Sequence, residues 1–507
     1  MNIFSSSRSS EYAIARGAAV IAAMLLAGCA VGPDFKPPKP EAPADFAAWH
    51  GGSAALLDAG RAAPAASAAP RDWTMFGDPV LDALEKRALA ASPDLRTAAL
   101  HFAQSRAQLG VVRSQQGPQL NASGGVTRMR ESEYGETTRL LDAIGGTNSA
   151  QLIQILSEPH NFYQAGFDAS WELDFWGRVR RSIESAEASS DASQALLAQA
   201  RWNVQAEVAR RYFELRAVQR QIAITHGDIA AADETLELVK ARADGGLGTD
   251  LDVNQQAAQA AGLRAQLPQL QAQEAQAHNQ LTLLLGERPG ALQAELAPLP
   301  DNAAAPVLPD LSLGLPSELA QRRPDIRQAE AQLHAATANI GVAVADLYPR
   351  ITLGASFGYQ SVDGSTFGEW GSRQWSVGPS LQLPIFDNGR LRRTITLREL
   401  QQQEAAVSYQ QTVLKAWHEI DDALTAYTAE RQRNAQLAAR ERSSRDALQL
   451  AQVRYEHGLT DFLVQLDAQR TLLQAEHDHA ESTSRLALGL VAVSKALGGA
   501  SVPKGDS

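Results

Sequence analysis

The chain has 507 residues, too long for one compact core, because single hydrophobic cores stop growing near about 250–300 residues. Hydrophobic residues make up 44% and charged residues 20%, which excludes a protein of many membrane-spanning helices and a fully disordered chain. The net charge is −11 with no basic tail or stripe, so we expect no nucleic-acid partner. A single cysteine excludes an intrachain disulfide and a cysteine-cluster metal site.

Residues 1–28 have the pattern of a lipoprotein signal peptide. A basic leader with Arg8 and Arg16 precedes an apolar run at 17–26, which is too short to cross a bilayer. The run ends in Leu26-Ala27-Gly28-Cys29, which resembles a bacterial lipobox and implies cleavage before Cys29 and acylation of Cys29. The alternative is an ordinary cleavage site with a chance cysteine. The lipobox is favoured because the sole cysteine of the chain stands where that motif requires it.

The residues after Cys29 indicate where such a lipoprotein would stay. In this class an Asp after the cysteine suggests retention in the inner membrane, so Ala30 points to the outer membrane. Two or more acyl chains would give a stable anchor in the lipid. Residues 29–70 are rich in Ala and Pro, and we interpret them as an extended, acylated N-terminal tether.

The rest of the chain is an internal two-fold duplication. The offset between matching positions falls from 231 to 212 residues, so the first copy carries 19 more residues between Leu120 and Gly166. The order of anchors predicts a first repeat at 71–296, a linker at 297–315, a second repeat at 316–498 and a tail at 499–507. The anchors are Pro93-Asp94-Leu95-Arg96 with Pro324-Asp325-Ile326-Arg327, Gly177-Arg178 with Gly389-Arg390, and Leu285-Gly286 with Leu497-Gly498.

Four segments alternate between apolar and polar residues, which predicts strands at about 119–129, 163–173, 350–360 and 374–384. One face is apolar with aromatic ends and the other is small and polar, which is typical of a transmembrane β-barrel. The alternative is a soluble sandwich with one wet face.

Four strands cannot close a barrel, and an open strand edge is not tolerated in lipid. The chain must therefore associate with further copies. Two copies would give eight strands and a barrel filled by its own side chains. Three copies would give twelve strands and a lumen, which the small polar inward faces favour.

Each repeat also predicts a very long helix, at 177–243 and at 389–457. The first contains no proline over 67 residues, about 100 Å at 1.5 Å per residue. Returning helices at 251–285 and 462–497 match little more than half of that length. We expect the shorter helices that begin at Pro93 and Pro324 to cover the rest, end to end with the returning ones. Faces of Ala, Gln and Leu suit close packing with a wet inner side; a long bundle with a dry core is the alternative.

Taken together, the motifs resemble the outer-membrane factor family of tripartite efflux pumps, the TolC-like fold. The lipoprotein branch that works with resistance-nodulation-division transporters shows the strongest likeness, over nearly all of 29–498. The motifs are the Cys29 lipobox, Val31-Gly32-Pro33-Asp34-Phe35, Phe175-Trp176-Gly177-Arg178, Phe386-Asp387-Asn388-Gly389-Arg390 and Leu466-Asp467-Ala468-Gln469-Arg470.

This resemblance implies a mixed α and β membrane protein. Three chains would form one outer-membrane β-barrel, with four strands from each chain, continued by a long periplasmic α-helical barrel. The homotrimer would passively conduct small molecules, such as drugs or other toxic compounds, out of a Gram-negative cell. Its implied partners are outer-membrane lipid, a periplasmic adaptor (membrane fusion) protein and an inner-membrane resistance-nodulation-division transporter. The family has no catalytic residue and no cofactor, and we expect no metal site.

The family closes its tunnel at the periplasmic helix tips. The resemblance places an apolar constriction at Leu463 and an acidic one at Asp467. The alternative for Asp467 is a solvated carboxylate beside a helix N-terminus, where a negative charge is favourable in any case. Candidate contacts of the tips with partners are Asp250, Asp252, Arg454, Tyr455 and Asp461.

We assign no functional site to two other segments. His477-Asp478-His479 is not a predicted metal site, because histidines two apart on a helix point to different faces. Residues 128–162 hold the 19 extra residues, and we expect a surface loop there.

Three rival functions remain at this stage. The exit duct of a type I protein-secretion system would use the same fold. A surface-exposed coiled-coil lipoprotein would require that the four alternating segments stay out of lipid. An enzyme lacks support, because the chain has no nucleophile–base grouping, phosphate-binding loop or paired-carboxylate motif.

The assignment of Cys29 makes the first testable prediction. We expect the mature protein to begin at Cys29 and to carry acyl chains, which intact-mass measurement detects. In Cys29→Ser the lipid mass should be absent, while part of the protein still reaches the membrane because the barrel inserts independently of the anchor. An unchanged mass in Cys29→Ser would show that the chain is not acylated at this residue.

Overall fold

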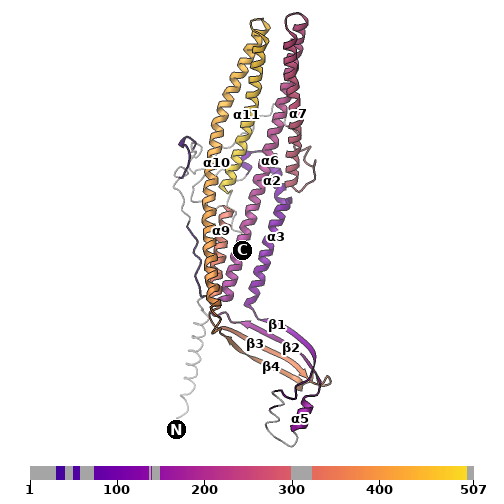
Figure 1. Ribbon diagram of the computed structural model, residues 1–507, viewed down its shortest axis with the longest axis vertical. Helices are drawn as coiled ribbons and strands as arrows, with labels where there is room; N and C mark the ends of the chain where they lie inside the picture. Colours follow the sequence, from indigo (N-terminus) through magenta and orange to yellow (C-terminus); the bar gives the residue numbers. More distant parts are fainter. Residues whose placement is uncertain are drawn as a thin grey trace, which may run out of the picture. The chain divides into compact units, whose positions relative to one another are not determined.

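The computed structural model describes residues 30–39, 49–56, 73–135, 139, 149–298 and 323–498. The predicted signal peptide 1–28, Cys29, most of the linker 297–315 and the tail 499–507 lie outside these residues. The chain forms two compact units, the first from residues 1–36, 105–190 and 332–405 and the second from the remainder (Figure 1). Each unit therefore takes residues from both sequence repeats. The repeats are not separate structural domains, because elements of one repeat pack against those of the other.

The first unit contains one antiparallel sheet, in which the strands follow chain order (Figure 1). Its inner strands β2 and β3 come from different repeats and pair with each other. The outer strands β1 and β4 each have one edge without a partner among the described residues. The strands are β1 (Gln119–Met129), β2 (His160–Glu172), β3 (Arg350–Ser361) and β4 (Arg373–Gln382).

The register of the sheet separates an apolar face from a polar one. Partners across all four strands share a face, so that apolar and polar rows alternate along the sheet. One apolar row consists of Ala122, Phe167, Phe357 and Trp375. The neighbouring polar row consists of Asn121, Asp168, Ser356 and Ser376. Side-chain hydrogen bonds join members of the polar row, with 3.1 Å between Asn121 Nδ2 and Asp168 Oδ2 and 2.8 Å between the Ser356 and Ser376 hydroxyls.

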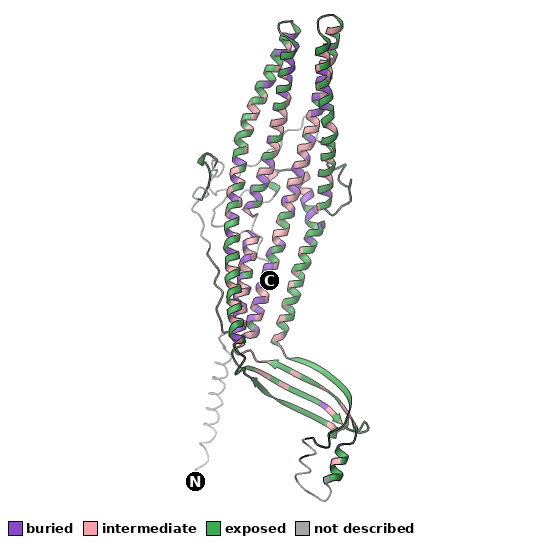
Figure 2. Ribbon diagram, in the orientation of Figure 1, coloured by how far each residue is buried: buried purple, intermediate pink, exposed green. Residues whose placement is uncertain are grey.

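The described part of the chain covers neither face of the outer strands. Every residue of β1 and of β4 is exposed, including the apolar Val126 and Trp375 (Figure 2). An exposed apolar face of this size needs a further partner, which can be lipid or protein. None of the helices in the described part of the chain has the length and apolarity needed to cross a lipid bilayer.

Aspartates at the strand ends start the two long helices. The Asp174 carboxylate accepts hydrogen bonds from the backbone N–H groups of Val179 (3.0 Å) and Arg180 (2.9 Å) at the start of α6 (Arg178–Asp244). Asp387 accepts from Leu391 (2.8 Å) at the start of α10 (Arg390–Glu456). This bond with Leu391 lowers the pKa of Asp387 below its ordinary value. Both turns thus satisfy N–H groups that a helix start leaves without partners.

The returning helices meet the shorter helices end to end, as the sequence predicts. At the end of α7 (Asp250–Leu284), a Cβ on Gly286 would lie 3.2 Å from Cδ of Pro93, which begins α3 (Pro93–Arg113). At the end of α11 (Phe462–Leu497), the Ala496 carbonyl accepts a hydrogen bond of 2.8 Å from Arg323, just before α9 (Pro324–Ala345). The same junction therefore occurs once in each repeat.

The main core of the second unit lies where these helices pack together. It is lined by α2 (Pro79–Ala91), the middle of α6 and the end of α7, with Trp73 buried beside them. The Tyr212 hydroxyl donates to the Asp78 carboxylate, which also caps α2 through the Val80 N–H (2.9 Å). A further helix, α5 (Ser149–Leu156), lies in the segment predicted as a loop at 128–162.

The two faces of the sheet make the second prediction. In Phe357→Arg the charge falls on the apolar face, and we expect a loss of stability of about 2–4 kcal/mol if that face meets lipid near the midplane. In the matched variant Ser356→Arg the charge falls on the polar face of the same strand and should be tolerated. Urea unfolding of the protein in lipid vesicles measures the free energy of unfolding of both variants. Equal stabilities of the two variants would contradict the assignment of the faces.

Candidate functional site

The candidate site is the pair of turns that close the two helical hairpins. The α6–α7 turn and the α10–α11 turn share one hydrogen-bond pattern. The Leu247 N–H donates to the Arg242 carbonyl and the Leu459 N–H to the Arg454 carbonyl, each at 2.8 Å. Gly246 (φ +74°) and Gly458 (φ +69°) take the left-handed conformation that ends each helix.

The helices that follow the turns start differently. Thr249 and Asp252 form a capping box, in which Asp252 Oδ2 accepts from the Thr249 N–H (3.0 Å) and hydroxyl (2.9 Å). The Asp252 carboxylate therefore serves the helix start. Asp461, the residue that caps α11, makes no side-chain cap hydrogen bond. Asp250, Arg454 and Asp461 are exposed, so these predicted tip contacts are accessible in the chain.

Tyr455, predicted as a tip contact, is instead a packing residue. Only 6% of its surface is exposed, and it shares a small core with Val239, Phe462 and Leu466. The Arg242 guanidinium lies 4.4 Å from the centre of the Tyr455 ring, which gives a cation–π contact between the hairpins. Burial raises the pKa of Tyr455 above its ordinary value. Its ring therefore joins the hairpins and is not available as an accessible contact.

Leu463 and Asp467 lie together on the exposed side of α11. They stand four residues apart on the helix, and Leu463 keeps 53% of its surface exposed while Phe462 and Leu466 are buried. The Asp467 carboxylate forms no ion pair within the described part of the chain, and the nearby Arg470 donates to Gln259 instead (3.1 Å). The structure thus gives this face one apolar and one unneutralised acidic side chain.

Exposed leucines at both turns are further candidate residues that the sequence pattern does not single out. Leu247 is 74% exposed and Leu459 is 68% exposed, at matching positions of the two repeats. Large apolar side chains that are exposed together at a tip are typical of a docking surface. The Gly-Leu pair that occurs in both repeats could indicate these leucines from the sequence. The same pair is equally typical of an ordinary helix end.

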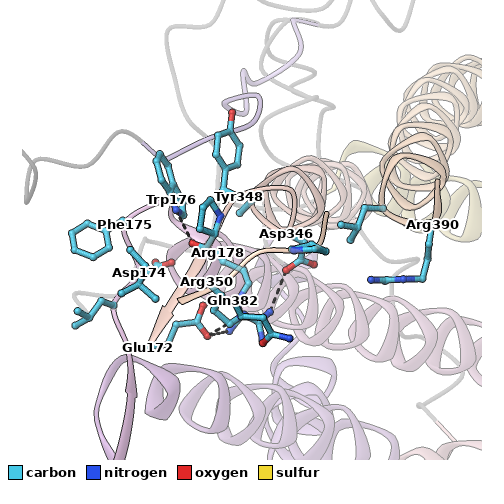
Figure 3. Close-up of a pocket in the computed structure, with 16 residues that line it drawn as sticks. Glu172, Asp174, Phe175, Trp176, Arg178, Asp346, Tyr348, Arg350, Gln382 and Arg390 are labelled. Atoms are coloured by element: carbon cyan, nitrogen blue, oxygen red, sulfur yellow. Dashed lines mark hydrogen bonds and ion pairs between the residues drawn. The ribbon is translucent and has the colours of Figure 1, made fainter. Parts of the chain in front are cut away.

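A polar cavity of about 260 Å³ lies where strands meet helices in the first unit (Figure 3). Ion pairs join four of its charged side chains. Arg178 binds Glu172 at 2.7 Å and Arg350 binds Asp346 at 3.3 Å. Trp176 donates to the Pro349 carbonyl at 3.0 Å. These contacts give the cavity a structural role in joining β2, β3 and α6.

The two histidines on α11 bond residues of different helices. His477 lies 3.2 Å from Asp228 on α6, while His479 bonds Glu441 on α10, so the two side chains point to different helices. Within the described residues, no group of three or more His, Cys, Asp or Glu side chains could hold a metal ion.

The chain is similar to known proteins over most of its length. A family model described as outer membrane efflux protein matches residues 84–287 and 315–499. The outer membrane protein OprJ of Pseudomonas aeruginosa is 33% identical over 484 residues, 95% of each chain. The pyoverdine export outer membrane protein OpmQ of Pseudomonas putida is 34% identical over 433 residues, 85% of this chain and 88% of that protein. The structure of the outer-membrane channel OprN superposes with a TM-score of 0.80 at 33% identity, covering 93% of this chain and 99% of that one.

Proposed function

Because this chain belongs to the outer membrane efflux protein family, we propose that it is the outer-membrane channel of a tripartite efflux system. It conducts small molecules, such as drugs or other toxic compounds, passively from a periplasmic adaptor and pump to the exterior. The observation that carries this function is the sheet with one apolar face, one polar face and two edges that no described strand pairs with. Relatives named as efflux and export proteins favour this function over a protein-secretion duct.

The working unit is a homotrimer. Three sheets joined edge to edge give twelve strands, enough to enclose a water-filled lumen. The apolar row with Phe167 and Phe357 then faces lipid, and the polar row with Asp168 and Ser356 lines the lumen. The small side chains of the polar row suit a wide path that carries compounds of different shapes.

The chain is held to the outer membrane in two ways, by its barrel and by acyl chains on Cys29. The lipobox that ends at Cys29 and the Ala30 that follows it support this second anchor. Two attachments make the association with the membrane effectively permanent.

The helix tips dock the periplasmic adaptor, which links the channel to an inner-membrane resistance-nodulation-division transporter. The exposed side chains of Leu247 and Leu459 give each tip an apolar contact at matching positions. Charged side chains lie near these contacts, namely Asp250, Arg454 and Asp461. Charges at an interface contribute more to the specificity for a partner than to the affinity. The specificity for exported compounds then rests with the pump.

The resting channel is closed by rings of Leu463 and Asp467. Threefold symmetry turns each exposed side chain into a ring, so that the leucines exclude water and the carboxylates select by charge. Three carboxylates at close range repel one another, so the ring needs a cation or partial protonation. The lack of an ion pair to Asp467 within the described part of the chain supports this charged ring.

The gate makes the third prediction. In Leu463→Ala with Asp467→Ala we expect a higher single-channel conductance of the purified protein in planar bilayers, because both the apolar block and the charge ring are removed. Block of the current by divalent cations should weaken as well. The measurement is the conductance with and without a divalent cation.

The duplication supplies a matched control. Leu251 is the counterpart of Leu463 in the first repeat and is exposed at 62%. Leu251→Ala should leave the conductance near that of the parent protein. If the double variant also matches the parent, or if Leu251→Ala opens the channel equally, Leu463 and Asp467 do not form the gate.

A further inference from the structure

We propose that residues 30–35, called here the anchor latch, dock in a groove formed by α6, the turn before it and α9. This docking fixes the height along the protein at which the acyl chains enter the membrane. The groove consists of Trp176, Gly177, Arg181, His334 and Gly341. The inference rests on the acylation of Cys29 proposed above and adds a site that holds the acylated end of the chain. All of these latch and groove residues belong to the first unit.

A buried arginine binds the latch at two points, a backbone carbonyl and a side-chain carboxylate. Arg181 has only 6% of its side chain exposed, and its Nη2 lies 2.6 Å from the Asp34 carboxylate. Its Nε donates to the Val31 carbonyl (3.3 Å), and the Val31 N–H donates to the Trp176 carbonyl (3.1 Å). A buried guanidinium needs such partners, because an unpaired buried charge is strongly destabilising.

An aromatic contact fixes the other end of the latch. The Phe35 ring stacks on His334 with 4.3 Å between ring centres and 13° between planes. Glu184 bonds both His334 (2.9 Å) and Arg181 (2.7 Å), so α6 and α9 share one network under the latch. Burial alone would raise the pKa of Glu184, but its bonds to Arg181 and His334 outweigh burial and lower it. The side chains under the latch are therefore linked to one another as well as to the latch.

Glycines let the backbones approach closely. Gly32 has φ +93°, and a Cβ there would lie 2.5 Å from Cα of Gly341. A Cβ on Gly341 would also lie 2.8 Å from Cγ of Arg181. Any larger residue at 341 would therefore push against the Arg181 side chain, which holds Val31 and Asp34 of the latch. A Cβ on Gly110, the counterpart of Gly341 in the first repeat, would meet nothing within 4 Å, so the described residues show no matching contact in that repeat.

The latch ends beside the boundary between strands and helices. A Cβ on Gly177 would lie 2.8 Å from Cβ of Ala30, and Trp176 stacks on Tyr348 with 4.7 Å between ring centres. Cys29 precedes Ala30, and consecutive Cα atoms are about 3.8 Å apart. Acyl chains on Cys29 thus start at the end of the strands, beside a Trp–Tyr pair of the kind enriched at membrane–water interfaces.

The test measures hydrogen exchange of the acylated, full-length protein in lipid vesicles. In the parent protein the Val31 amide should exchange about tenfold more slowly than in Asp34→Ala with Phe35→Ala, because docking protects it. These substitutions lie in the tether, and Arg181 keeps its ion pair with Glu184 (2.7 Å), so we expect the helices to stay intact. Gly341→Leu, which crowds the Arg181 side chain, should remove the protection as well. Gly227→Leu on α6 should keep it, since a Cβ there would meet nothing within 4 Å among the described residues.

A spin label at Lys36→Cys reports the level of the anchor, because acylated Cys29 offers no free thiol. Loss of the latch should change the label's accessibility to oxygen and to a water-soluble nickel complex. Equal exchange of Val31 in the parent and the tether variant overturns the docking, and unchanged label accessibility overturns the role in setting the level. Intact mass decides separately whether Cys29 is acylated, so failure of that proposal is distinguishable from failure of the latch.

Discussion

The unpaired edges of the four-stranded sheet are the constraint on which the rest of the structure depends. β1 and β4 each present a row of backbone N–H and C=O groups, and no described strand of the same chain reaches them. Each such group costs several kcal/mol if it is left in lipid without a partner. Only further copies of the chain satisfy all of them at once. The apolar and polar faces then fall outside and inside a closed barrel without any change of register.

The duplication explains why the same structural devices occur twice and why their differences matter. Gly246 and Gly458 end the long helices with the same turn, and Asp174 and Asp387 start them. The repeats differ where one copy carries a task of its own. Gly341 lies against Gly32, whereas a Cβ on its counterpart Gly110 would meet nothing within 4 Å among the described residues.

Much of this fold is predictable from the sequence, because its signals are local and strong. Alternation over ten residues predicts each strand, and a long run without proline predicts each long helix. The distant contacts carry no such signal. Tyr455 is buried because Arg242 and Val239 come from another hairpin, and Asp34 binds Arg181 across 147 residues of sequence. The exposed leucines at the tips are not predicted for a different reason. Their signal is local, but a leucine after a helix-ending glycine is too common to indicate a contact site.

The closure of the sheet by three chains is tested most directly by cross-linking its two edges. Ala122→Cys on β1 and Trp375→Cys on β4 place one thiol on the apolar face of each edge strand. With a short bismaleimide, applied to the protein in membranes, a closed trimer gives products of two and three chains and none larger, because the ring closes at three. Either single-cysteine variant has one thiol per chain and should give no product larger than two chains. A ladder that continues beyond three chains, or double-cysteine chains that remain single, would contradict the closed trimer.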